Sequence, residues 1–296
     1  MIPRSVVGRS LTCPRGRIPF QATRCFSTTS AAGNQRASVQ ENNTLARPHG
    51  IDPRWLTTMK GRIGRCISFG LQPAQVEGAG DILRQLARDW RELIAGSEGF
   101  LTDEKRRSLY RHNVVWGEMD VMGHVNNVTY VRYAESARVN WTRNIGLHVD
   151  TSNREKWLNL LNSTGIGLIL RSIKVDYKFP MTFPDKITVY QKLVHDPNSS
   201  PSSQSAFQLQ VMILSEARQR PAARCYEDIV TYDYRRNQKT PELPPFILDQ
   251  FKAIWRLQEQ AKKEWQEKIA DLENQVRTLE LESWDCKDAV EDTGSA

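Results

Sequence analysis

The sequence predicts an α+β fold in which a largely antiparallel sheet accompanies one long helix. A strand over residues 110–118 precedes a helix over 127–145, whose apolar residues recur on one stripe. Further strands are expected after residue 160, and over 173–179 apolar and charged side chains alternate as in a half-buried strand. The connections between these later strands are too short for helical crossovers, so neighbouring strands should run antiparallel.

Amphipathic helices are expected on both sides of this domain, which we place at residues 106–240. In an N-terminal helical extension over 51–105, apolar residues recur at helical spacing in two segments, 55–71 and 80–95. A long C-terminal helix is predicted within 245–284, where five apolar residues follow heptad spacing: Trp265, Ile269, Leu272, Val276 and Leu279. About two heptads are too few to establish a coiled coil, so packing on its own domain and binding of a partner stay equally open.

The excess positive charge of the chain lies at its N-terminus. Six of the 41 Lys and Arg residues fall within the first 40 residues, together with nine Ser or Thr and no Asp or Glu. The remainder carries 35 basic and 34 acidic side chains, so no nucleic-acid partner is expected. An Arg-rich, Ser-rich, acid-free start is typical of a mitochondrial transit peptide, which we expect over 1–26. We expect residues 27–50 to form a linker and the mature protein to lie in the mitochondrial matrix; a disordered basic tail is the alternative to a transit peptide.

Composition also disfavours a membrane-spanning protein, a disulfide-bonded protein and a zinc protein. No segment approaches about 18 uninterrupted apolar residues, so no membrane span is expected. The five cysteines show no CxxC spacing, which disfavours both a disulfide framework and a zinc site; they are Cys13, Cys25, Cys66, Cys225 and Cys286. We expect no metal and no cofactor. The acidic end of the chain, 285–296, is expected to be disordered.

One segment carries most of the chemical information: W-G-E-M-D-V-M-G-H-V-N-N-V-T-Y, residues 116–130. A strand brings Asp120 to a Gly-His turn, and a helix starts directly afterwards. The N-terminus of a helix offers free N–H groups and a positive dipole end, which suit a carbonyl oxygen that becomes an oxyanion. We expect Gly123, Asn126 and Asn127 to form this oxyanion site. A carboxylate beside it can activate water or attack directly, so the segment indicates acyl transfer or acyl hydrolysis.

The segment resembles the hotdog-fold thioesterases of the 4-hydroxybenzoyl-CoA thioesterase type. The matching parts are the string quoted above, the R-Y-A-E-S-A-R that follows at 132–138, and V-D-Y-K-F-P-M-T-F-P-D at 175–185. The resemblance covers roughly residues 108–236. The extensions on either side look like those of fungal mitochondrial thioesterase-like proteins. The resemblance implies a hotdog fold, an antiparallel sheet wrapped around one central helix, and homodimers whose active sites form between two protomers.

The resemblance also assigns roles to residues of the turn. It implies that Asp120 is the catalytic carboxylate and that His124 orients or polarises. Plant acyl-carrier-protein thioesterases have a catalytic Asn two residues after the Asp, where this chain has Met122. An Asp–Asn–His mechanism is therefore disfavoured. The structural alternatives are that Asp120 caps the turn or the helix and that His124 is a packed turn residue.

The helix adds a candidate second carboxylate. Glu135 lies where some hotdog enzymes use a carboxylate, although it could equally pair with Arg138 at i+3. Asn126 and Asn127 could serve only as caps and turn formers. Glu118 is expected to be structural or to lie on the surface.

The sequence thus predicts an acyl thioester hydrolase, acting in mitochondrial lipid metabolism on coenzyme A or acyl-carrier-protein thioesters as a homodimer or higher homo-oligomer. The chief alternative is a non-catalytic hotdog scaffold docked in a mitochondrial assembly such as the mitoribosome, because fold does not fix function. A hotdog dehydratase is a third interpretation, but the sequence shows no second motif for it.

Overall fold

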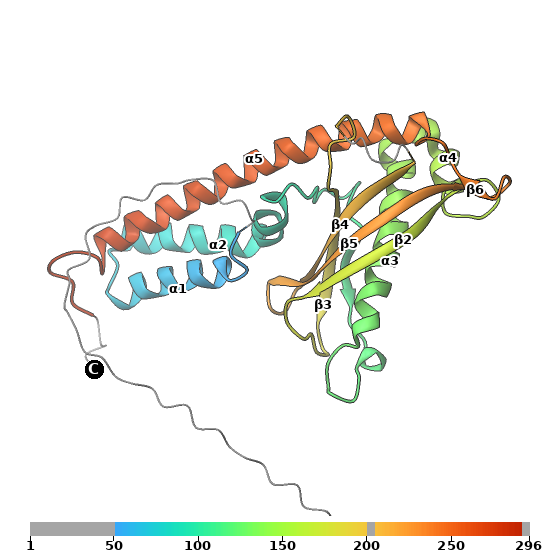
Figure 1. Ribbon diagram of the computed structural model, residues 1–296. Helices are drawn as coiled ribbons and strands as arrows, with labels where there is room; N and C mark the ends of the chain where they lie inside the picture. The colour runs from blue at the N-terminus through green and yellow to red at the C-terminus, as the bar shows by residue number, and fades with distance from the viewer. Residues whose placement is uncertain (1–50, 200–204, 292–296) are drawn as a thin grey trace, which may run out of the picture. The chain divides into compact units, whose positions relative to one another are not determined.

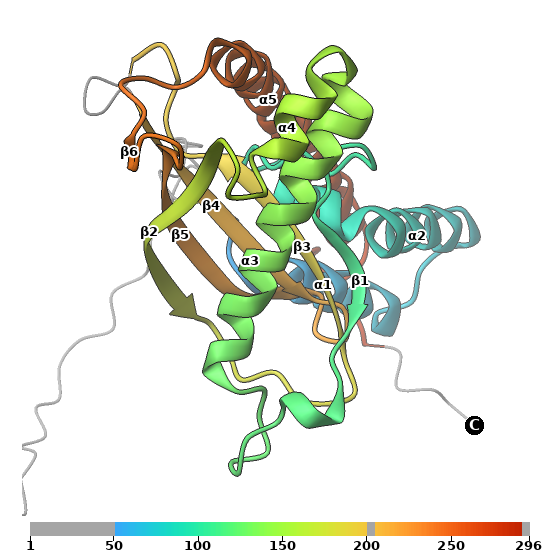
Figure 2. The same ribbon diagram turned by 90° about the vertical axis from the view of Figure 1, so that its right-hand side faces the viewer.

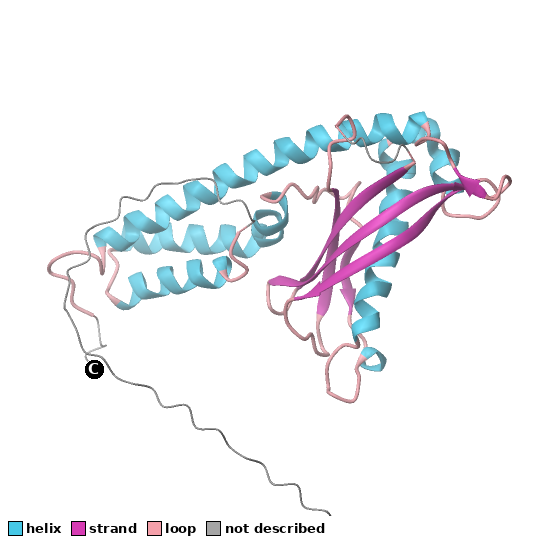
Figure 3. Ribbon diagram, in the orientation of Figure 1, coloured by secondary structure: helices cyan, strands magenta, loops and turns pink. Residues whose placement is uncertain are grey.

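The computed structural model describes residues 51–199 and 205–291. The predicted transit peptide, the linker over 27–50 and the last part of the acidic tail lie outside these residues. Figures 1 and 3 show the order of elements. The helices are α1 (Trp55–Ser68), α2 (Pro73–Gly96), α3 (Asn127–Asn144), α4 (Arg154–Asn159) and α5 (Pro245–Glu282). The strands are β1 (Leu109–Asn113), β2 (Ile166–Tyr177), β3 (Lys186–Leu193), β4 (Ala206–Ser215), β5 (Arg220–Asp233) and β6 (Gln238–Lys239).

All strand pairs are antiparallel, in the order β1-β3-β4-β5-β2, with β6 added to β5. Figure 2 shows the sheet curving around α3. The predicted hotdog fold of α+β class, one long helix wrapped by an antiparallel sheet, is therefore confirmed.

Helix α3 packs on the sheet through small and aromatic side chains. Ala134 and Ala137 are fully buried, so the helix backbone approaches β3 closely, and the Gln191 amide donates to the Ala134 carbonyl at 3.4 Å. The strand residues on this inner face alternate with outward ones, as the period of a strand requires. Val189, Val211 and Ile213 belong to this inner core.

Several boundaries differ from the sequence-based expectation. The first strand ends at Asn113, and residues 116–118 form a 3₁₀ turn, so the predicted strand over 110–118 is too long. Helix α2 begins at Pro73 rather than near residue 80, because proline is pre-organised for the first helical position and gives up only an N–H that would be unpaired there. Helix α4 was not predicted.

Helices α1, α2 and the second half of α5 form a separate core. Ile269, Leu272, Val276 and Leu279 of α5 are buried among apolar side chains of α1 and α2. A Cβ atom on Gly96 would clash with the Trp265 ring, so glycine permits this close contact. The heptad stripe is therefore used inside the chain, which favours the interpretation of a helix packed on its own chain.

This helical extension covers part of the outer face of the sheet. Tyr190, Met212 and Leu214 point away from α3 and are buried in the same core as the helices. At the boundary, Arg224 forms a bidentate ion pair with Glu98, at 2.6 and 2.7 Å.

Lys192 lies at the same boundary and donates to the Glu98 carbonyl oxygen. Burial lowers the pKa of Lys192 to about 8. The boundary is thus closed by buried ionic and polar contacts as well as by apolar packing, and the part of the sheet face at Tyr190, Met212 and Leu214 is not free for another protein.

Among the described residues, no helix has both the length and the apolar composition needed to cross a membrane. Over residues 51–199 and 205–291, no group of three or more His, Cys, Asp or Glu side chains could hold a metal ion.

The packing of α5 makes a prediction about stability. Leu272 is fully buried, so Leu272→Ala should lower the free energy of unfolding by about 2–5 kcal/mol, through lost burial and the cavity left behind. Leu281 on the same helix is 50% exposed, and Leu281→Ala should change stability by less than about 0.5 kcal/mol. Urea denaturation of both variants checks this. Equal effects of the two substitutions would contradict the packing described here.

Candidate active site

Asp120 sits at the start of a tight turn between the 3₁₀ turn and α3. The Gly123 N–H donates to the Asp120 carbonyl at 3.0 Å, and the Asp120 N–H donates to the His124 carbonyl at 2.8 Å. Gly123 has a φ of +75°, a left-handed conformation that glycine adopts without strain. The turn is closed by a bridge between Met119 and Val125. The sequence thus folds here into a small hairpin that fixes the Asp120 backbone.

The two carboxylate oxygens of Asp120 have different surroundings. Oδ1 accepts from the Met122 N–H at 2.8 Å and lies 3.4 Å from the His124 N–H, so it caps the turn. For Oδ2, the described residues offer no hydrogen-bond partner, and the side chain is half-buried. The structural and catalytic interpretations of Asp120 are therefore compatible, since one oxygen holds the turn and the other remains free.

The N-terminus of α3 offers fewer free N–H groups than the sequence predicts. The N–H of Gly123 is used by the turn, that of Val125 donates to the Met181 carbonyl at 2.8 Å, and that of Asn126 donates to the Glu118 carbonyl at 2.9 Å. The expectation that Gly123 and Asn126 donate to an oxyanion is therefore wrong. Within the described residues, the Asn127 N–H has no acceptor, so it is the donor that remains for an oxyanion.

Asn126 has a different function, as a helix cap. Its Oδ1 accepts from the Val128 N–H at 3.1 Å, which satisfies one of the N–H groups that a helix leaves unpaired at its start. The capping alternative for Asn126 is therefore confirmed.

The His124 imidazole does not contact Asp120 by a hydrogen bond; among the described residues its ring nitrogens have no partner. Only the His124 backbone N–H faces the carboxylate. The imidazole therefore has no contact through which it could orient Asp120. That it polarises a substrate stays a prediction.

Glu118 links the segments that surround the site through hydrogen bonds. Its Oε2 accepts from the Tyr133 hydroxyl at 2.6 Å and from the Val115 N–H at 2.9 Å. Burial and this bond to Glu118 raise the pKa of Tyr133, so the phenol stays protonated. The nearby Tyr130 hydroxyl accepts from the Met181 N–H at 3.1 Å. These contacts tie the 3₁₀ turn and the segment before β3 to α3, which makes Glu118 a structural residue.

Large apolar side chains surround the turn on the surface. Trp116 and Met122 are each 74% exposed and Val121 is fully exposed. The Phe183 ring, from the segment between β2 and β3, packs edge-on against Trp116 with centroids 5.9 Å apart. Exposed apolar groups that cluster together mark binding sites for ligands or other proteins. The sequence motif contains these residues but gives no sign that they are exposed.

Glu135 lies away from this turn. It is eight residues after Asn127 on α3, which places it about 12 Å along the helix at 1.5 Å per residue. The ion pair between Glu135 and Arg138, which the i+3 spacing left open, does not form. Arg138 instead pairs with Glu227 of β5, with Nη1 and Oε1 at 2.5 Å.

Glu227 was not found by sequence reasoning, because its partner lies 89 residues earlier in the chain. Its side chain is fully buried beneath α3. Burial raises the pKa of Glu227, while Arg138 opposes this effect.

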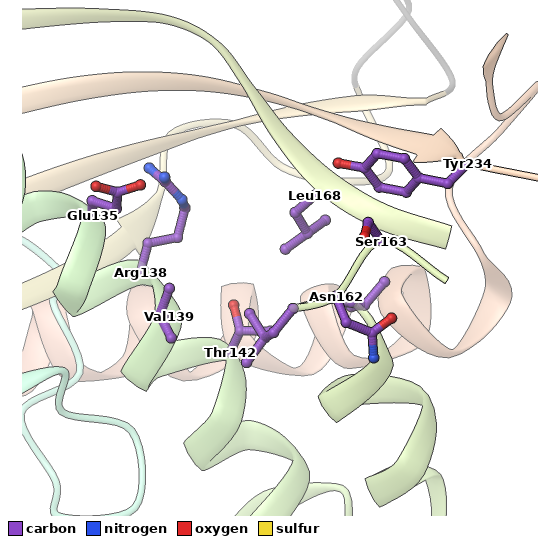
Figure 4. A pocket seen from close by; sticks show the side chains of 10 residues that line it. Glu135, Arg138, Val139, Thr142, Asn162, Ser163, Leu168 and Tyr234 are labelled. Carbon is purple, nitrogen blue, oxygen red and sulfur yellow. The ribbon is translucent and has the colours of Figure 1, made fainter. Parts of the chain in front are cut away.

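Glu135 and Arg138 border a cavity of about 350 Å³, shown in Figure 4, between α3, residues 160–163 and β2. The candidate site residues therefore fall into two groups: the turn at the start of α3 and this cavity beside its second half.

Part of the chain is similar to a known protein family. Residues 114–251 match the family model described as the Thioesterase-like superfamily, and this segment holds the turn, α3 and β2 to β6. The match supports a place for these residues in that superfamily. A comparison with curated protein sequences gives no match.

Solved structures of thioesterases resemble the same part at low sequence identity. A thioesterase from Thermus thermophilus, solved with coenzyme A and Zn, is 22% identical with a TM-score of 0.39; the match covers 53% of this chain and 96% of that chain. A DHNA-CoA thioesterase from Staphylococcus aureus is 18% identical with a TM-score of 0.36, over 57% of this chain and 93% of that chain. These are distant likenesses, and the sheet wrapped around α3 is what defines the fold.

Proposed function

We propose that this protein hydrolyses acyl thioesters at the Asp120 turn. The observation that carries the proposal is a carboxylate oxygen of Asp120 that has no partner among the described residues, on the turn that leads into a long helix whose first residue, Asn127, keeps an unpaired N–H there. The match of residues 114–251 to the Thioesterase-like superfamily supports this reaction class.

The proposed reaction starts with the thioester carbonyl oxygen accepting from the Asn127 N–H. Oδ2 of Asp120 takes a proton from a water molecule, whose oxygen attacks the carbonyl carbon. The tetrahedral intermediate then breaks its C–S bond, and the leaving thiolate takes the proton that Asp120 holds. In the alternative route the Asp120 carboxylate attacks the carbonyl carbon and expels the thiolate, and water then hydrolyses the resulting anhydride, which returns the carboxylate. An oxyanion donor typically contributes about 10²–10³ in rate.

We place the substrates among acyl thioesters of coenzyme A or acyl-carrier protein, as in the 4-hydroxybenzoyl-CoA thioesterase type that the motif resembles. A scaffold protein would need free surface for docking, such as the apolar stripe of α5 or the tryptophans of the N-terminal helices. In the structure Trp55, Trp90 and most of the stripe are buried within the chain, which disfavours the scaffold alternative.

Asp120→Asn should lower the single-turnover rate of acyl-CoA hydrolysis by about 10²–10⁴, because an amide is neither a general base nor a nucleophile here. The amide oxygen can still accept from the Met122 N–H, so the turn should persist. His124→Ala should have a smaller effect. Rates are measured on medium- and long-chain acyl-coenzyme A, with thermal melts as a check of folding.

Glu118→Gln is the matched control, since it changes a neighbouring carboxylate and keeps an oxygen that accepts from Tyr133 and Val115. It should hydrolyse nearly as fast as the wild type. If Asp120→Asn also does so, the assignment of Asp120 is wrong and Glu135 is the next carboxylate to test. If the wild type hydrolyses no thioester, the scaffold alternative replaces this proposal.

We also propose that the protein assembles as a homodimer through β2. Strands β1 and β2 are the edges of the sheet, and exposed edges invite pairing with another chain. The β2 edge is twelve residues long, against five for β1. A back-to-back dimer through β3 and β4 is disfavoured, because the helical extension covers part of that face.

Light scattering at micromolar concentration should therefore give at least twice the monomer mass. Replacing Val175 of β2 by proline removes a backbone N–H from the edge strand and should shift the mass toward the monomer. A wild-type monomer would contradict the assembly.

For location, we propose the mitochondrial matrix, on the basis of the acid-free, Arg-rich first 40 residues. Deletion of residues 2–26 should leave a fluorescently tagged protein in the cytosol, while the full chain co-localises with mitochondria. Mitochondrial localisation of the deletion variant would overturn this interpretation.

A further inference from the structure

The cavity beside the second half of α3 has no role in the reaction proposed above. It has a volume of about 350 Å³ and lies between α3, residues 160–163 and the start of β2. Leu160, Leu168 and Val139 give it apolar walls. Figure 4 shows that Thr142 of α3 and Tyr234, just after β5, lie on opposite sides of it. The lining as a whole is more polar than apolar, so the cavity suits a part of a ligand that carries both apolar groups and a polar group.

Thr142 is the most informative residue of the cavity. Its side chain is fully buried, and its Oγ1 has no hydrogen-bond partner among the described residues. A buried hydroxyl without a partner costs free energy, so such groups in folded proteins call for an explanation. Because Thr142 lines the cavity, a ligand that enters could supply the missing partner.

The charges around the cavity restrict the chemistry of that ligand. Arg138 is neutralised by its ion pair with the buried Glu227, and Glu135 adds a further negative charge at the rim. A carboxylate on the part of the ligand that enters the cavity would therefore find no unpaired cation there. A neutral hydroxyl group suits the cavity better, because it can both donate and accept a hydrogen bond.

The face of α3 that borders the cavity also leads back to the Asp120 turn. Val128, Val131, Glu135, Arg138 and Thr142 are spaced 3, 4, 3 and 4 residues apart, so they lie on one face of the helix. At 1.5 Å per residue, Thr142 lies about 22 Å along the helix from Asn127. A long extended chain could join the two positions.

We propose that the cavity receives the far end of a long-chain acyl group that carries a hydroxyl there, and that Thr142 recognises this hydroxyl. The proposal rests on the proposed function, in which the thioester carbonyl lies at the Asn127 N–H. A methyl-terminated chain would leave the Thr142 hydroxyl unpaired, whereas an ω-hydroxyl would bond to it. The protein therefore distinguishes acyl groups by a polar group at their far end.

The test is binding of free ω-hydroxyhexadecanoate and hexadecanoate, measured by isothermal titration calorimetry, which needs no hydrolysis. The wild type should bind the hydroxylated acid more tightly by on the order of tenfold, the effect of one satisfied buried hydroxyl. Thr142→Val keeps the shape of the side chain and removes the hydroxyl, so it should abolish the preference. Ser136→Ala removes an exposed hydroxyl of the same helix outside the cavity and should retain it.

Equal affinity of the wild type for the two acids, binding of neither, or a preference that survives in Thr142→Val would overturn the proposal. The titrations are repeated with Asp120→Asn, whose binding preference should be that of the wild type. Hydrolysis of thioesters is measured separately, so that the proposed function and the cavity assignment can fail independently. If no thioester is hydrolysed and yet the preference depends on Thr142, hydrolysis is wrong and the cavity assignment stands. If thioesters are hydrolysed without any such preference, the reverse holds.

Discussion

The burial of α3 against the inner face of the sheet is the constraint on which the other features depend. Ala134 and Ala137 allow the helix to approach β3, and the strands then curve around it. This packing fixes where the helix begins, and so where the Asn127 N–H lies relative to the Asp120 turn. It also places Arg138 over β5, where a buried Glu227 must be neutralised. One contact surface therefore positions both the turn and the cavity.

The turn shows how one side chain can serve structure and chemistry together. Oδ1 of Asp120 accepts from the Met122 N–H, and this bond orients the carboxylate. The second oxygen then points away from the bond that holds the turn. Most N–H groups around it are already paired with Asp120, Met181 or Glu118. Because these groups are paired, the backbone around the turn is rigid, and the unpaired Asn127 N–H is held in place as a donor for a developing negative charge.

The extensions contribute in another way. The first half of α5 packs Phe251 and Ile254 near α3 and α4, and its second half joins the core of α1 and α2. Between the two halves, the Gln258 amide bonds to both the N–H and the carbonyl of Leu193 at the end of β3, at 2.9 and 3.1 Å. The helix is thereby fixed to the sheet at the point where it passes from one core to the other.

How far the sequence predicts this structure depends on the range of the interactions. Local signals were sufficient for α3 and for the alternation that marks β2, because these depend on neighbouring residues. They left Asn126 open between a helix cap and an oxyanion donor, and the structure shows the cap. The partner of Arg138 could not be predicted, since i+3 spacing offered only Glu135 and the fold supplied Glu227 from a distant strand. The exposure of Trp116 and the unpaired Thr142 hydroxyl were equally hidden, because both depend on how distant segments pack.

The measurement that tests the central claim most directly is the release of free thiol by the purified wild-type protein from a series of acyl-coenzyme A thioesters of increasing chain length. Carboxylic acid is quantified in the same samples. The account predicts that thiol and acid appear in equal amounts, at a rate proportional to protein concentration. Absence of thiol release above the uncatalysed rate from every member of the series would contradict it.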